Sequence, residues 1–239
     1  MQTIILAGGR GVRLDPFSRI LPKPLFPIGD KPIAEILVHQ LQSAGVNEII
    51  MCLGYLADFI KLYFQDGSFW GLTIRYSVEN DPLGTAGPLR LVKDLEDDFL
   101  VVNGDELTTL DFRALYDHHL QTQADMTVAV HNKSVNSSFG VLEIEEGRVT
   151  AYREKPTINY WASMGIYVIN KRILSFIPEN ERFDMPDLVQ RLLKEKARVV
   201  SYESQDLWFD IGTMADFEKA KEEFNTILEA GKLFKRGQT

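Results

Sequence analysis

The most informative stretch of the chain is TIILAGGRGVRLDPFSRILPKPLFP, at residues 3–27. It begins with an apolar run over residues 3–7 that predicts a buried strand, and the run stops at Gly8 and Gly9. Glycines after the first strand of an open α/β sheet let backbone N–H groups approach a phosphate or nucleotide closely. The stretch has no Walker A Gly-Lys-Ser/Thr, and Leu14 stands where a dinucleotide fingerprint has its third glycine. It therefore predicts a ligand loop that follows neither of these two patterns.

Four prolines, at positions 16, 22, 24 and 27, follow the glycines. Because proline lacks a backbone N–H and clashes with the preceding helical turn, we expect a stiff, ordered loop here and no helix. The loop carries Arg13, Arg19 and Lys23 at the edge of the sheet where ligands bind in such folds. A solvated basic loop is the alternative. In a chain of net charge −8, however, three cations on a stiff loop favour an anionic ligand.

Apolar runs and amphipathic segments alternate along the chain, which predicts an α/β fold whose mainly parallel sheet is covered on both faces. In the first half we expect strands over residues 3–7, 48–53, 72–78 and 99–103, and helices over 32–44, 57–64 and 86–95. In the second half we expect strands over 126–131, 140–144, 148–153, 164–169, 198–202 and 207–210, and helices over 184–194 and 213–228. The turn signal at residues 146–147 predicts an antiparallel part, so the sheet is partly mixed.

The chain reads as a single domain over residues 1–239, with a nucleotide-binding half at 1–110. Residues 111–239 form the expected sugar-phosphate-binding half and C-terminal helix. The tail from residue 231 is expected to be mobile or to dock on a partner. We expect no second activity, because no further repeat or domain pattern follows the last helix.

Composition excludes several classes of function. A net charge of −8 over 239 residues argues against binding to nucleic acid or to an anionic membrane. The one cysteine, Cys52, lies in an apolar run and is expected to be buried and inert. The first residues have no basic segment and too short an apolar run for a signal peptide or a membrane span. We therefore expect a cytoplasmic protein.

An ordered set of motifs adds a resemblance to a known family. The motifs are LAGG-x-G-x-RL-x-P-x-S at 6–18, PKP at 22–24, DPLGTAG at 81–87, NGD at 103–105, FGV at 139–141, EKP at 154–156, GIY at 165–167 and WFDIGT at 208–213. Together they resemble the signature of the sugar-1-phosphate nucleotidylyltransferases, most closely the mannose-1-phosphate and manno-heptose-1-phosphate guanylyltransferases. Ser163 and Met164 depart from the Asn-Ala that many guanylyltransferases carry before the glycine. The resemblance implies a Rossmann-like three-layer α/β/α fold.

The resemblance also implies a reaction, in which a nucleoside triphosphate and a sugar 1-phosphate give an NDP-sugar and pyrophosphate with Mg²⁺. Arg13, Lys23 and Asp105 are the implied catalytic residues: Arg13 holds the triphosphate, and Lys23 contacts its α-phosphate. The implied nucleotide-binding residues are Leu6, Ala7, Gly8, Gly9, Gly11, Arg13, Lys23, Glu79, Gly84, Thr85 and Asp105. The implied sugar-phosphate-binding residues are Asn103, Gly140, Glu154, Lys155, Ser163 and Gly165, with Lys155 on the phosphate.

Asp105 and Asp210 are the predicted Mg²⁺ ligands, because each follows a strand and hard carboxylate oxygens suit this ion. For Asp210 the alternative is an N-cap of the helix beginning near residue 213, and for Asp105 a side-chain hydrogen bond within a turn. Gly104, between a buried strand and Asp105, is expected to leave space for the nucleotide beside the backbone.

The resemblance places a base-reading glutamine or glutamate at the position of Glu79, five residues before Gly84, and this predicts the base. A carboxylate only accepts hydrogen bonds, and guanine offers two adjacent donors, N1–H and N2–H. Uracil and thymine present one donor between two acceptors, which suits glutamine better. The sequence therefore predicts GTP, with a uridylyltransferase or thymidylyltransferase as the alternative. A non-catalytic nucleotide-sugar-binding regulatory subunit is the alternative from another class, and a homodimer is the assembly we expect.

Overall fold

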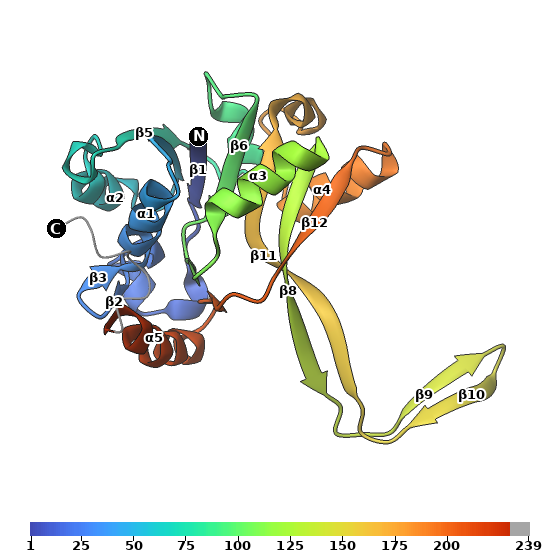
Figure 1. Ribbon diagram of the computed structural model, residues 1–239. Helices are drawn as coiled ribbons and strands as arrows, with labels where there is room; N and C mark the ends of the chain where they lie inside the picture. The colour runs from blue at the N-terminus through green and yellow to red at the C-terminus, as the bar shows by residue number, and fades with distance from the viewer. Residues whose placement is uncertain (230–239) are drawn as a thin grey trace.

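A seven-stranded sheet forms the centre of the protein, with strand order β12-β8-β11-β6-β1-β4-β5 (Figure 1). The computed structural model describes residues 1–229, the last five by their backbone alone. The mutually parallel strands are β1 (Gln2–Ala7), β4 (Glu48–Leu53), β5 (Thr73–Val78) and β6 (Asp98–Asn103). β11 (Thr157–Asn170) runs antiparallel between β6 and β8 (Met126–Asn136), and β12 (Val199–Ser204) is parallel to β8. The mainly parallel, partly mixed sheet is confirmed.

Helices cover both faces of this sheet, because successive strand residues point to opposite sides. Ile5 and Met51 face α1 (Ile33–Ser43), α2 (Ala57–Phe64) and α3 (Phe112–Thr122) in one apolar core. Ile4 and Ile50 face the opposite core, formed with α4 (Met185–Lys194) and the 3-10 segments Gly87–Leu91 and Lys171–Phe176. The predicted three-layer arrangement is therefore present.

A third apolar cluster joins the two ends of the described chain. Leu14 and Phe26 of the proline-rich loop pack with Phe217 and Phe224 of α5 (Met214–Glu229), and the rings of Phe26 and Phe217 meet edge to face at 5.7 Å. Small strands complete this region: β2 (Pro27–Ile28) with β3 (Lys31–Pro32), and β7 (Glu106–Thr108) with β13 (Trp208–Asp210). The tail expected from residue 231 lies outside the described residues.

Two expectations about helices are corrected. The segment at 86–95 is only a 3-10 helix at Gly87–Leu91, because Pro88 lacks a donor and the N–H groups of Ala86 and Gly87 both donate to the carbonyl of Phe183. The proline-rich loop contains no α-helix but does form three 3-10 turns, Val12–Leu14, Phe17–Arg19 and Lys23–Leu25. A further short 3-10 turn, Ser68–Trp70, follows α2.

β8 and β11 are longer than predicted, and they leave the body of the molecule together. Their paired ends lead to a hairpin of β9 (Val141–Glu145) and β10 (Arg148–Arg153) that projects away from the body (Figure 1). We call residues 132–162 the arm. Polar residues such as Asn132, Ser134 and Asn136 break the apolar pattern there, which is why the sequence predicts a strand that ends at residue 131.

Cys52 is buried in β4, as predicted, and burial raises the pKa of its thiol to about 12, so it stays protonated. Within residues 1–229, none of the helices combines the length and the apolar character that a bilayer crossing requires.

Candidate active site

Lys23 and Asp105 meet at the carboxyl edge of the central sheet. β1 and β6 are parallel neighbours, so the loops that follow them emerge on the same edge. The ammonium Nζ of Lys23 donates to Oδ2 of Asp105, and both side chains are largely shielded from solvent, at 10% and 27% exposure. The two predicted catalytic residues are 82 positions apart in the sequence, and the fold brings them into direct contact.

Asp210 reaches the same edge through a different strand pair. β13 lies antiparallel to β7, and Asp210 is the register partner of Glu106, which follows Asp105. The N-cap alternative does not hold, because Thr213 takes that place: its hydroxyl oxygen accepts from the N–H of Asp216 at 3.3 Å, and its own N–H donates to Oδ2 of Asp216 at 2.9 Å. Asp210 is exposed and is therefore open to a ligand.

Glu106 lies between Asp105 in the chain and Asp210 in the strand register, and the sequence alone assigned it no functional role. Its Oε2 accepts from the indole Nε1 of Trp208 at 2.7 Å, and its Oε1 accepts from Nδ2 of Asn103 at 3.2 Å. Burial raises the pKa of Glu106 well above its ordinary value, and the negative charges of Asp105 and then Asp210 add to this effect. A Cβ at Gly165 (φ +70°) would overlap Asn103 and Glu106, so β11 can pass here only with a glycine.

Arg13 faces the same region from the proline-rich loop. A Cβ placed on Gly212 would lie 3.4 Å from Nη1 of Arg13, so the guanidinium rests against the turn that follows Asp210. Arg13, Lys23, Asp105 and Asp210 therefore share one edge of the fold, which the predicted catalytic site requires.

Gly8 of the glycine-rich loop packs closely against the side chain of Glu79, as does Gly54. A Cβ on Gly8 would come within 2.8 Å of Oε1 of Glu79, and one on Gly54 within 3.0 Å. The second oxygen, Oε2, accepts from the N–H of Leu83 at 3.1 Å. Burial raises the pKa of Glu79, and the Leu83 bond partly offsets this. Gly9 has open space where a side chain would be, so its backbone is accessible from that side.

Gly11 and the end of β1 shape the same loop. Gly11 has φ +60°, which turns the chain back toward Lys23. Leu6 and Ala7 are the last residues of β1, and the carbonyl of Leu6 accepts from the N–H of Gly104 at 2.8 Å. The expectation that Gly104 leaves room for a nucleotide is wrong: its Cβ position lies 3.1–3.2 Å from Leu6 and Ala7, so β1 fills that space.

Gly84 and Thr85 are tied to the start of α4. The N–H of Thr85 donates to Oδ1 of Asp184 at 3.0 Å, and the hydroxyl of Thr85 accepts from the N–H of Met185 at 2.7 Å. Gly84 has φ +81°, and a Cβ there would overlap Asp184 and Phe183. The polar groups of Thr85 thus bind α4, so contact with a nucleotide here is left to the remaining backbone of the loop.

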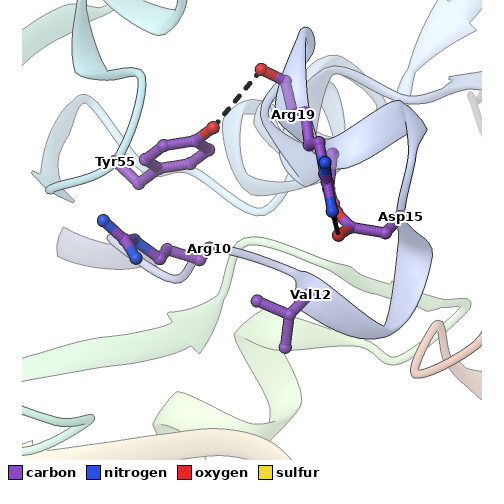
Figure 2. Close-up of a pocket in the computed structure, with 6 residues that line it drawn as sticks. Arg10, Val12, Asp15, Arg19 and Tyr55 are labelled. Atoms are coloured by element: carbon purple, nitrogen blue, oxygen red, sulfur yellow. Dashed lines mark hydrogen bonds and ion pairs between the residues drawn. The ribbon is translucent and has the colours of Figure 1, made fainter.

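A pocket of about 240 Å³ lies beside the glycine-rich loop (Figure 2). The guanidinium of Arg10 stands over the ring of Tyr55, 5.4 Å from its centre, and the Tyr55 hydroxyl donates to the carbonyl of Arg19. Arg19 binds Asp15 through two nitrogens at 2.9 and 3.0 Å, which neutralises its charge locally. Arg19, which the sequence singled out, lines this pocket but is paired with Asp15; Arg10, the residue within the Gly-Gly-x-Gly pattern, lines the pocket as well.

The predicted sugar-phosphate residues divide into two places. Asn103 and Gly165 are in the body beside Glu106, and Ser163 is at the root of the arm, where its hydroxyl meets that of Tyr167 at 3.1 Å. Gly140, Glu154 and Lys155 are on the arm, away from the sheet edge that carries Asp105 (Figure 1). The Glu154 carboxylate accepts from the hydroxyl of Tyr152 on the same hairpin.

The two carboxylates fit a magnesium ion that takes its other ligands from water and phosphate. Asp105 and Asp210 offer hard oxygens on one edge, and both act electrostatically on the carboxyl of Glu106 between them. In the part of the chain that the structure describes, no group of three or more His, Cys, Asp or Glu side chains forms a site that could hold a metal ion alone.

The comparisons with known proteins agree with this geometry. The nucleotidyl transferase family matches residues 2–226, which is nearly all of the chain. This chain belongs to the nucleotidyl transferase family. The D-glycero-alpha-D-manno-heptose 1-phosphate guanylyltransferase of Aneurinibacillus thermoaerophilus is 31% identical, over 93% of this nucleotidyltransferase and 98% of the relative.

Two further relatives of this nucleotidyltransferase are informative. The UTP–glucose-1-phosphate uridylyltransferase of Synechocystis is 30% identical over 92% of the chain, which spans 62% of that longer protein. The crystal structure of HddC from Yersinia pseudotuberculosis complexed with GMP-PN superposes with a TM-score of 0.71, at 27% identity and with coverage of 93% and 99%.

Proposed function

We propose that this protein is a sugar-1-phosphate nucleotidylyltransferase that joins a nucleoside triphosphate, with GTP preferred, to a hexose or heptose 1-phosphate. The products are an NDP-sugar and pyrophosphate. The observation that carries the proposal is the convergence of Arg13, Lys23, Asp105 and Asp210 on the edge of the sheet that also carries the glycine-rich loop. Cations beside carboxylates at a nucleotide loop suit the transfer of a charged phosphoryl group.

The proposed chemistry is an in-line displacement. An oxygen of the sugar phosphate forms a bond to the α-phosphorus, the bond from that phosphorus to the bridging oxygen breaks, and pyrophosphate leaves with the electron pair. In this proposal Lys23 holds the α-phosphate, and Arg13 holds the triphosphate and the departing pyrophosphate. Asp105 and Asp210 would hold Mg²⁺, which would neutralise part of the phosphate charge.

The contact between Lys23 and Asp105 gives Lys23 a second role, which is to compensate the charge of Asp105 before substrates bind. In the described chain the two side chains are each other's partners. When substrates bind, the Lys23 ammonium is drawn toward the phosphate and frees the Asp105 carboxylate. The pair thus keeps two oppositely charged, partly buried groups compensated before substrates arrive, which avoids the cost of an unpaired buried charge.

The preference for GTP rests on Glu79. Its carboxylate is held against Gly8 and Gly54 and is partly buried, so a base that lies on the glycine-rich loop meets an acceptor. Guanine can donate to it from N1–H and N2–H. The guanylyltransferase and GMP-PN relatives support this choice, and the uridylyltransferase relative supports UTP as the second candidate.

Screening for pyrophosphate release tests the function directly. GTP, UTP and dTTP are each combined with mannose 1-phosphate, manno-heptose 1-phosphate and glucose 1-phosphate in the presence of Mg²⁺. Turnover with any pair supports the proposed reaction. Nucleotide binding without release of pyrophosphate would contradict it and favour a regulatory subunit. The cytoplasmic location, the single domain and its division near residue 110 stay predictions.

Glu79→Gln tests the reading of the base. The variant removes the charge but keeps the size, so kcat/KM for GTP is expected to fall about 10- to 100-fold, as when a charged hydrogen bond is lost. The ratio of kcat/KM for GTP over that for UTP is the measurement. Asp81→Asn, an exposed acid on the same loop, is the matched control. An unchanged ratio in Glu79→Gln would contradict this assignment.

A further inference from the structure

Lys133, at the root of the arm, contacts the body of the protein. Its ammonium lies over the indole of Trp208, with Nζ 4.5 Å from the centre of the ring. The face of an indole carries negative charge density, so it attracts a cation in this position. Trp208 begins β13, the strand that ends in Asp210. The contact therefore joins the arm to a strand of the candidate active site.

The direction of the strands brings Lys133 to the catalytic edge of the sheet. β11 runs antiparallel to β6, and β8 antiparallel to β11, so the outer end of β8 lies at the edge where β6 ends in Asn103. Alternate residues of a strand point to the same side, and Ala129, His131 and Lys133 therefore share one face. Ala129 belongs to the apolar core against which Trp208 packs. The ring of His131 also meets that of Trp208, at 5.9 Å, so two side chains of this face hold the indole.

The indole of Trp208 connects Lys133 with a buried carboxyl group. In the register of β7 and β13, Trp208 is opposite Thr108 and Asp210 is opposite Glu106, so these side chains share one face of the pair. The face of the indole meets Lys133, and its Nε1–H donates to Oε2 of Glu106 at 2.7 Å. Glu106 is only 3% exposed. If the indole moved, this buried acceptor would lose a partner that water cannot readily replace.

The ammonium of Lys133 is bound in an unusual way for this chain. Lys23, Lys31 and Lys171 each pair with a carboxylate. Lys133 is half-buried, yet among the described side chains no carboxylate pairs with it, and its ammonium lies on the indole instead. Holding a lysine side chain in one position costs conformational entropy, which the attraction of the ring must offset. The contact with Trp208 is therefore the interaction that places this side chain.

We propose that Lys133 is a positioning residue for the proposed nucleotidyl transfer. Its ammonium holds the indole of Trp208, and the indole holds Glu106 through its N–H. Glu106 follows Asp105 in the chain and is opposite Asp210 in the register, so its position fixes the backbone that carries both proposed Mg²⁺ ligands. Lys133 acts through Trp208 and touches no substrate. The effect on the reaction rests on the proposed function, whereas the contacts that transmit it do not.

Lys133→Met tests the role in the reaction. The change removes the charge and keeps the apolar stem, so kcat is expected to fall about three- to fivefold, as for the loss of one cation–π contact. KM for each substrate is expected to stay within about twofold, because Lys133 binds neither of them. Lys133→Arg keeps a cation that stacks on an indole and is expected to retain kcat within about twofold.

Arg148→Met is the matched control, because it removes an exposed cation from the hairpin of the same arm. It is expected to leave kcat unchanged. An unchanged kcat in Lys133→Met would overturn the proposal, as would an equal loss in Lys133→Arg. A higher KM for the sugar 1-phosphate with an unchanged kcat would show that Lys133 binds this substrate itself, which also contradicts a positioning role.

A double-mutant cycle tests whether Lys133 acts through Trp208. Trp208→Leu removes the ring, so adding Lys133→Met to this variant is expected to lower kcat no further. The same loss in both backgrounds would mean that Lys133 acts without the indole, and the proposal would be wrong. If Trp208→Leu does not fold, the indole resonance of Trp208 decides the question in the single variants.

That resonance is observed without substrates. The chain has three tryptophans, so a ¹H–¹⁵N spectrum contains three indole N–H signals, and Trp208→Phe identifies one of them by its loss. The N–H of Trp208 donates to a carboxyl group, and a shift of the indole changes this bond. Lys133→Met is expected to move the Trp208 signal and to leave those of Trp70 and Trp161 in place. Arg148→Met is expected to move none. An unmoved Trp208 signal in Lys133→Met would overturn the proposal.

The two proposals fail in different ways. A wild-type protein that releases no pyrophosphate with any substrate pair overturns the proposed function, and the kinetic role of Lys133 with it. The indole signal then still decides whether Lys133 holds Trp208. An active wild-type protein whose kcat is the same in Lys133→Met overturns the positioning role and leaves the proposed function standing.

Discussion

The carboxyl edge of the sheet and the arm carry different halves of the same candidate site, and they are built in opposite ways. At the edge, Lys23, Asp105 and Glu106 have charged or polar partners on rigid strand ends. On the arm, Glu154 and Lys155 are exposed on a two-stranded hairpin that packs on nothing in the described chain. The edge therefore holds its charged side chains in defined contacts, whereas Glu154 and Lys155 lie on an exposed hairpin.

Asp105→Asn is expected to have the largest effect, because it removes half of the carboxylate pair and the partner of Lys23. We expect kcat for pyrophosphate release to fall roughly a thousandfold or more, as for the loss of a main electrostatic group. Asp58→Asn, at a fully solvated acid on α2, is the control. A loss below tenfold in Asp105→Asn would mean that the edge is not the catalytic half of the site.

Lys155→Met tests the arm at a smaller expected magnitude. The change removes the charge and keeps the apolar stem, so KM for the sugar 1-phosphate is expected to rise about 10- to 100-fold. KM for the nucleotide is expected to stay within about twofold, because the edge binds it. Lys171→Met, a solvated lysine on the body, serves as the control. If both KM values rise together, the division of tasks between edge and arm does not hold.

Substitutions of Trp208, in the body, and of Trp161, on the arm, allow a direct comparison of the two regions. Trp208→Phe removes the donor to Glu106, and Glu106→Gln removes one of the two acceptors. Each change is expected to lower the free energy of unfolding by about 1–2 kcal/mol and kcat by about tenfold. Trp161→Phe, on the exposed arm, is expected to change neither.

A double-mutant cycle from urea unfolding measures the coupling between Glu106 and Trp208. Additive losses would contradict a shared role for these two residues. An effect of Trp161→Phe on kcat as large as that of Trp208→Phe would contradict the contrast between body and arm.

The smallest expected effect is a pH dependence of stability that belongs to the body alone. Burial lowers the pKa of His119, and its neutral ring binds Thr127 Oγ1 at 2.8 Å and Asp98 Oδ1 at 3.1 Å. The folded state then binds fewer protons than the unfolded state below the ordinary histidine pKa of about 6.5. Stability should therefore be lower at pH 5.5 than at pH 7.5. His119→Gln should reduce this difference in urea unfolding; an unchanged difference would point to other groups.

The sequence predicted best what short segments determine. Residues 3–7 and 99–103 are apolar runs that end in glycine, and each is a buried strand that leads into the candidate site. Asp105 lies in the turn directly after β6 and Asp210 ends β13, so both lie at strand ends as predicted, and Lys23 lies on the proline-rich loop as predicted. Here the local pattern and the fold agree.

Contacts between distant residues could not be predicted in this way. Glu106 and Trp208 lie 102 positions apart, and only the fold shows that they bind each other. The close approach of Gly104 to β1 is likewise a matter of packing, whereas its sequence position suggested space for a ligand. The arm was missed as an extension because its polar alternate residues look like a loop until the register with residues 157–162 is known.

The cluster that joins the proline-rich loop to α5 has a consequence for biosynthesis. Leu14 and Phe26 are made well before Phe217 and Phe224, which cover them. Because a chain emerges from the ribosome with its amino terminus first, the central strands can assemble while this cluster still lacks half of its members. The loop that carries Arg13 and Lys23 is therefore fully packed only after residue 224 has left the ribosome.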